Sequence, residues 1–335
     1  MVKRILYLHC GPAKTGTSAI QAYFRDVAPA GLLYPATGQW SDGAHHQLIF
    51  SLKGLARRGE VDIPPLDGLA AALEAELNGS DGDALISSEA LDPGSGLPAL
   101  LDHFAPLIAR RFDQVVPIVV LRHPLERAAS CYNQDVKDPV TAEARLPDAY
   151  LRVRTRSFLT MPLVRAWRRA FPGTVFLSYH PAETLVPRFL GLVGHHAPEP
   201  LAPSRRNPSI GGYALAGLLA ANRCLKKPEL AQALFERMRR ERRRQLWEGN
   251  AFPFSAEACL QAMAQHIRPD LETLAARTKI DLRGLHARPP ERFTLDPRDA
   301  ERLRDHIRAV APAGTGMGGV DTLLAGFAPA HSDTS

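Results

Sequence analysis

The feature that most constrains this chain is a strand, a glycine-containing loop and a helix in immediate succession at its start. Residues 5–9 form a short apolar run ended by Gly11 and Pro12, which predicts a buried strand. From residue 17 to residue 24 the apolar spacing becomes helical. At a helix N-terminus the first N–H groups have no partner within the helix, and the helix dipole adds partial positive charge. The loop between strand and helix is therefore predicted to bind an anion.

The loop combines glycines, which allow a tight turn, with polar donors. Its expected anion ligands are Gly11, Lys14, Thr15, Gly16, Thr17 and Ser18. In nucleotide kinases the pattern is G-x-x-x-x-G-K-[ST], and its lysine serves the β- and γ-phosphates. Here Thr17 stands at the lysine position and the lysine lies inside the loop. The displaced lysine argues against ATP.

Three more strands are expected, at residues 84–87, 115–121 and 174–179. Helical patterns alternate with them, at residues 69–77, 98–112, 126–137, 162–171 and 181–192. Alternating strands and helices predict an α/β fold of three layers, with a central parallel sheet covered on both faces. We expect an α/β core over residues 1–195.

The organisation changes after about residue 195. Proline-rich residues 196–208 read as a loop, and helical patterns dominate residues 213–274 and 297–310. The predicted organisation is thus a core with an insertion at about 30–83, a mainly helical C-terminal part over 196–325, and a frayed tail at 326–335.

A second motif follows the strongly β-branched strand at 115–121. Arg122 and Ser130 stand at the ends of the sequence RHPLERAAS, which fits R-x-P-x-x-R-x-x-S. The planar guanidinium of arginine suits a phosphate dianion, and the start of a helix supplies further donors. An aspartate that would hold magnesium is absent from the end of this strand, which again argues against a nucleoside triphosphatase.

These two motifs resemble those of sulfotransferases that use 3′-phosphoadenosine 5′-phosphosulfate (PAPS), in particular bacterial members acting on carbohydrates. The family loop is close to P-K-[TS]-G-[TS]-[TS]-x-[LI]-Q; residues 13–21 read AKTGTSAIQ, with the proline shifted to Pro12. The resemblance implies a phosphate-loop fold and sulfuryl transfer from PAPS to a hydroxyl, with a glycan or glycolipid as the expected acceptor and no metal. It also implies that Lys14 acts at the bridging oxygen, while Arg122 and Ser130 hold the 3′-phosphate. Arg205 or Arg206 is a candidate to close that site, or part of an exposed basic loop.

The general base is left between two residues. Glu89 follows the strand at 84–87, where strand ends of an open sheet face the ligand crevice. His46, next to His45 in the insertion, is the alternative, because histidine titrates near neutral pH. Both histidines, Glu89 and Trp40 are candidate acceptor-binding residues. The less specific interpretations are a helix cap for Glu89, exposed loop positions for the histidines and packing for Trp40.

Composition narrows the alternatives only slightly. The net charge of +6 favours an anionic partner. Six arginines between residues 237 and 244 could bind a polyanion, but such runs are more often a solvated helix face, and no nucleic acid is expected. The four cysteines lack metal or redox spacing, and no apolar run spans a membrane, so a cytoplasmic protein is expected. The alternatives are a phosphate-loop kinase and a non-enzymatic polyanion-binding protein; the oligomeric state is not readable.

Overall fold

The computed structural model describes residues 3–27, 29–59, 61–196, 210–241 and 249–329. The chain forms two compact units that do not follow one another simply in sequence. The first comprises residues 1–122, 160–207 and 273–282, and the second comprises residues 123–159, 208–272 and 283–335. Each unit is described by itself.

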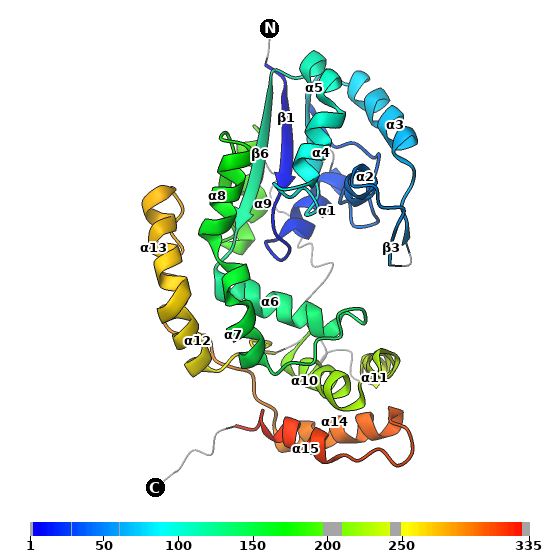
Figure 1. Cartoon of the computed structure of the whole chain (residues 1–335), viewed down its shortest axis with the longest axis vertical. Coiled ribbons are helices and arrows are strands. Elements are labelled where there is room, and N and C mark those ends of the chain that lie inside the picture. Colours follow the sequence, from blue (N-terminus) through cyan, green and yellow to red (C-terminus); the bar gives the residue numbers. More distant parts are fainter. Residues whose placement is uncertain (1–2, 28, 60, 197–209, 242–248, 330–335) are drawn as a thin grey trace. The chain divides into compact units, whose positions relative to one another are not determined.

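The first unit is built on a five-stranded sheet in the order β2-β5-β1-β6-β7, and every strand pair in it is parallel. β1 (Ile5–Cys10) is central, between β5 (Asp83–Ser87) and β6 (Gln114–Leu121). Figure 1 shows β1 and β6 side by side. The edge strands are β2 (Leu32–Leu33) and β7 (Val175–Ser178). The predicted α/β fold with a central parallel sheet is confirmed.

Helices and one small hairpin complete the first unit. In chain order they are α1 (Thr17–Val27), α2 (His46–Leu52), the antiparallel pair β3 (Arg57–Arg58) and β4 (Val61–Asp62), α3 (Leu66–Asn78), α4 (Gly96–His103), α5 (Ala105–Arg111), α8 (Thr160–Ala170), the 3-10 turn η1 (Ala182–Thr184) and α9 (Leu185–Leu192). The single helix predicted over residues 98–112 is wrong. It is two helices, because Pro106 in the first turn of α5 cannot continue α4.

The core of the first unit lies on both faces of the sheet. On one face Tyr7 and Leu85 pack with α1 and α9, whose buried side chains Ile20, Phe24 and Phe189 belong to the same cluster. The alternate residues of β1, Leu6 and Leu8 among them, are also buried. Burial on both faces explains why these strands are nearly continuous apolar runs.

The second unit is helical. Its elements are α6 (Pro124–Lys137), α7 (Pro147–Phe158), α10 (Gly212–Ala220), the π-helical turn η2 (Ala221–Leu225), α11 (Pro228–Glu241), α12 (Ala256–Ala262), the π-helical turn η3 (Met263–Ile267), α14 (Pro297–Val310) and α15 (Gly318–Ala325), while α13 (Arg268–Arg277) is shared with the first unit. The predicted helical C-terminal part is confirmed. The division into units differs from the predicted boundary near residue 195, because α6 contacts α10 and α7 contacts α12.

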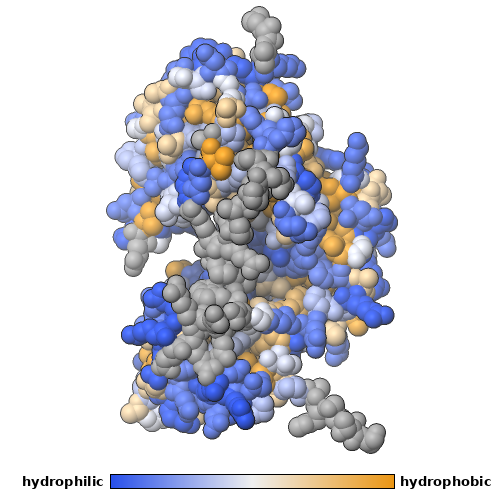
Figure 2. Space-filling model, turned by 180° about the vertical axis from the view of Figure 1, so that it is seen from behind, coloured by the Kyte–Doolittle hydropathy of each residue, from blue (hydrophilic) through white to orange (hydrophobic). Residues whose placement is uncertain are grey.

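The surface carries few large apolar side chains. Figure 2 shows mostly hydrophilic residues on one face, with hydrophobic residues in small groups among them. The four cysteines are free. Among the described residues, none of the helices has both the length and the apolar character that a membrane crossing requires.

Candidate functional site

The loop between β1 and α1 has the backbone geometry of a tight anion cradle. Gly11, Lys14 and Gly16 all have positive φ, at 146°, 71° and 86°. A side chain at Gly16 is excluded twice over, because a Cβ there would lie 2.4 Å from Leu185 Cδ2 and 2.9 Å from Tyr179 Cε2. The chain therefore needs glycine at this position, which brings the start of α1 close to the residues after β7.

The polar side chains of the loop divide into two groups. The Thr15 hydroxyl donates to the Pro12 carbonyl oxygen at 2.9 Å, and the Thr17 hydroxyl donates to Glu89 Oε1. Ser18 is exposed and Lys14 is half-buried. The two threonines therefore use their hydroxyls to shape the loop. The backbone at the start of α1, Lys14 and Ser18 are the candidate donors for a ligand.

Arg122, at the end of β6, is joined to the loop. Its Nη1 donates to the Lys14 carbonyl oxygen at 3.0 Å, and its guanidinium lies 4.4 Å from the centre of the Tyr179 ring. Tyr179 is fixed in turn by a bond from its N–H to the Leu121 carbonyl oxygen, at 2.7 Å. We did not predict Tyr179 as a site residue, although its place at the end of a predicted strand was a signal.

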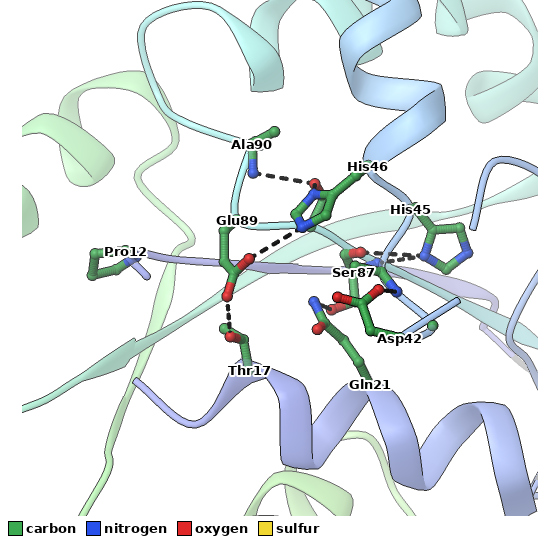
Figure 3. A network of polar contacts seen from close by, with 12 residues as sticks. Pro12, Thr17, Gln21, Asp42, His45, His46, Ser87, Glu89 and Ala90 are labelled. Carbon is green, nitrogen blue, oxygen red and sulfur yellow. Dashed lines mark hydrogen bonds and ion pairs between the residues drawn. The ribbon is translucent and has the colours of Figure 1, made fainter. Parts of the chain in front are cut away.

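Glu89, two residues after the end of β5, contacts the loop through Thr17 (Figure 3). Its two oxygens have different partners, with Thr17 at Oε1 and His46 Nε2 at Oε2, the latter at 3.2 Å. Burial alone would raise the pKa of Glu89, but the hydrogen bonds from His46 and Thr17 outweigh it and hold the pKa below its ordinary value. Glu89 is thus an ionised carboxylate at neutral pH, and its side chain is 25% exposed.

His46 belongs to a small polar and aromatic cluster at the start of α2. Its Nδ1 lies 2.8 Å from Ser88 Oγ. The ring stacks on Phe50, with centroids 5.5 Å apart and planes at 19°, and Trp40 meets it edge-on at 5.0 Å. The structure thus brings together three of the candidate residues, Glu89, His46 and Trp40.

His45 serves a different purpose. Its ring is fully buried, with Nδ1 accepting from the Ser87 N–H at 3.1 Å and Nε2 lying 2.8 Å from the Pro35 carbonyl oxygen. Its own N–H donates to the Ser87 carbonyl oxygen at 2.8 Å. Burial lowers the pKa of His45 to about 4, so the ring is uncharged at neutral pH. This geometry suits a residue that fastens the insertion to the end of β5.

A second buried histidine, His9, which we did not predict, contacts Ser87 at the end of β5. His9 of β1 places Nδ1 2.8 Å from Ser87 Oγ, and Gln21 Nε2 donates to that hydroxyl at 3.2 Å. Burial lowers the pKa of His9 to about 4, against the opposing effect of the Glu89 charge. The signal in the sequence was His9 near the end of the first predicted strand, together with Ser87 and Ser88 at the end of the second.

The remaining candidates are Ser130, Arg205, Arg206 and the arginine run at residues 237–244. Ser130 is on α6, in the second unit, and is half-buried. Arg205 and Arg206 lie outside the described residues. Of the arginine run at residues 237–244, Arg237 Nε donates to His306 Nδ1 at 3.1 Å and Arg239 pairs with Glu236 at 2.7 Å; residues 242–244 are outside the described part.

Comparison with known proteins gives little. Neither the protein-family models nor the curated proteins contain a match to this sequence. Among solved structures, a sulfotransferase from Alicyclobacillus acidocaldarius is similar, with 15% identity, a TM-score of 0.39, and coverage of 66% of this chain and 91% of that chain.

Proposed function

We propose that this protein is a sulfotransferase that moves the sulfuryl group of PAPS to a hydroxyl acceptor. The observation that carries the proposal is the meeting of three strand ends at one edge of the sheet. β1 leads into the loop that contains Lys14, β5 is followed two residues later by Glu89, and β6 is followed directly by Arg122; β1 lies between the other two strands. In open α/β sheets, ligands bind at the carboxyl ends of the strands, where the connections from neighbouring strands run to opposite faces of the sheet.

The cradle fits a phosphosulfate group. The N-terminus of α1, the half-buried Lys14 and the exposed Ser18 supply positive charge and donors, while Gly16 allows the close approach. Lys14 would neutralise the charge that builds on the bridging oxygen as its bond to sulfur breaks. Arg122 would hold the 3′-phosphate.

Glu89 is the group we assign to the acceptor's proton. As the acceptor oxygen bonds to sulfur, its hydrogen must leave, and an ionised carboxylate within reach accepts it. Glu89 is both ionised and partly open to solvent, and its bond from Thr17 ties it to the anion loop. His46 is the alternative base, and substitutions at both residues distinguish the two.

A carbohydrate or glycolipid hydroxyl is the proposed acceptor. Trp40 supports this, because its half-buried indole lies against His46 next to the proposed base, and aromatic faces pack well on the apolar faces of sugars. Trp40 comes from the insertion at 30–83, so the insertion would contribute to the acceptor pocket.

Labelled PAPS offered to a panel of glycans, glycolipids and small hydroxyl compounds tests this function. We expect label transfer by the wild type, and a Lys14→Ala variant should lose about 10²–10³-fold in kcat. Lys279→Ala, which removes an exposed lysine of the same unit, should match the wild type. Calorimetry should detect binding of adenosine 3′,5′-bisphosphate; binding of ATP with magnesium and not of the bisphosphate would favour a kinase instead.

A further inference from the structure

We propose that His46 and Ser88 are positioning residues: Ser88 fixes which nitrogen of His46 carries the hydrogen, and His46 then holds Glu89 in the orientation that accepts a proton. The inference rests on the proposed function for its catalytic meaning. Its basis is a count of the donors and acceptors along the chain of contacts from Ala90 through Ser88 and His46 to Glu89 (Figure 3).

Glu89 determines which nitrogen of His46 carries a hydrogen. An ionised carboxylate can only accept hydrogen bonds, and its Oε2 lies 3.2 Å from His46 Nε2. The hydrogen must therefore be on Nε2. In a neutral imidazole the other nitrogen is then an acceptor, so Nδ1 needs a donor.

Ser88 is that donor. Its Oγ already accepts the Ala90 N–H at 3.1 Å, which leaves the single hydroxyl hydrogen to donate to Nδ1 at 2.8 Å. Of the two neutral tautomers of His46, only the one with its hydrogen on Nε2 satisfies both the contact with Glu89 and the contact with Ser88. A buried serine in this position selects a tautomer in the way that second-layer groups select it for metal-bound histidines.

The same count makes His46 unsuitable as the base. With its hydrogen on Nε2 directed to Glu89 and its lone pair on Nδ1 occupied by Ser88, the ring has no lone pair left for a substrate proton. Its side chain is also 10% exposed, against 25% for Glu89. Glu89 uses one bond at each oxygen and retains a second lone pair on both.

The surroundings hold the ring still. Phe50 stacks on it and Trp40 meets its edge, while the His46 N–H donates to the Ala44 carbonyl oxygen at 2.8 Å. The titratable groups that act on Glu89 are His46 from α2 and His9 from β1. A rigid donor on a short helix, close to the anion loop, is what accurate placement of a base requires.

Four variants at these positions test the assignment through kcat, with KM and bisphosphate affinity measured alongside. Glu89→Gln should lose about 10³-fold or more in kcat, because the base is gone. His46→Ala should lose about 10²-fold, whereas His46→Gln, whose amide nitrogen can replace Nε2 as donor, should stay within about tenfold of wild type. Ser88→Ala should lose about three- to tenfold, and His103→Gln, at an exposed histidine, should change nothing.

The tautomer can be observed without any activity. In ¹⁵N-histidine spectra of the full chain, assigned by loss of the signal in His46→Gln, wild-type His46 should show a protonated Nε2 and an unprotonated Nδ1. In Ser88→Ala this fixed pattern should be lost. A His46 with its hydrogen on Nδ1 would overturn the proposal.

A folded His46→Gln variant as inactive as His46→Ala would also overturn it, because that result makes the ring itself the base. Failure of the proposed function appears differently: the wild type would transfer no label to any acceptor and bind no bisphosphate, whatever the spectra of His46 report.

Discussion

The anion cradle and the end of β5 meet at Glu89 but are built in opposite ways. The cradle, residues 11–18, is local: its shape comes from backbone torsions at positive φ in three of its residues and from a hydroxyl that bonds three residues back. The end of β5 is assembled from a distance, since His45 and His46 reach Ser87 and Ser88 across 42 residues of sequence.

This contrast suggests that the two regions fail for different reasons. The cradle should respond to any change that alters a backbone torsion or adds a side chain, whatever its polarity. The end of β5 should respond to changes of charge, because buried uncharged rings and a half-buried ionised carboxylate lie together there. The three predictions below test that difference.

The largest effect is expected at Gly16 in the cradle. A Gly16→Ala side chain would overlap Leu185 and Tyr179 while the backbone stays at φ 86°, so we expect a loss of about 2–4 kcal/mol in unfolding free energy and loss of bisphosphate binding. Gly54→Ala is the matched control, since Gly54 also has positive φ, 74°, but open space around it. Equal losses of unfolding free energy in Gly16→Ala and Gly54→Ala, measured by urea unfolding, would show that the positive φ alone, and not the contacts with Leu185 and Tyr179, makes glycine necessary.

A smaller effect per residue is expected from pH at the end of β5. Burial lowers the pKa of His9 and His45 to about 4, so these rings are neutral when folded and take up protons more readily when unfolded. Their stabilisation is complete above about pH 6.5, the ordinary pKa, and is lost as pH falls towards 4. Between pH 7 and pH 5, each of the two histidines should lower the free energy of unfolding by about 2 kcal/mol.

His45→Gln isolates one of the two contributions. The variant will be less stable at pH 7, but its further loss between pH 7 and pH 5 should be about 2 kcal/mol smaller than in the wild type. His103→Gln, at an exposed position, should keep the full wild-type loss. Urea unfolding at both pH values measures this, and an unchanged loss in His45→Gln would contradict the role of its buried neutral ring.

The smallest effect is expected where the cradle meets β6. Tyr179→Leu removes the ring under the Arg122 guanidinium, and we expect bisphosphate affinity to fall about two- to fivefold, as for an exposed cation–π contact. Tyr179→Phe keeps the ring and should bind like the wild type. Calorimetric titration of both variants decides it; an equal loss in Tyr179→Phe would mean that the hydroxyl, not the ring, carries the effect.

Much of the first unit was predictable from sequence because its signals are local. The strand at the start, the glycine loop and the β-branched strand at 115–121 each follow from residue type and spacing over fewer than ten positions. The α/β class followed from their alternation with helices. The break between α4 and α5 was missed, although Pro106 marks it.

What the sequence by itself determined is the backbone of the cradle, because glycines and a helix start fix the path of a short loop wherever the rest of the chain lies. From the sequence, Glu89 and His46 were only alternative candidates for the general base. Tertiary structure decided that they are partners, that His45 is a fastening and that His9 and Tyr179 belong to the site, since hydrogen bonds between residues far apart in sequence form only when the sheet brings the strand ends together.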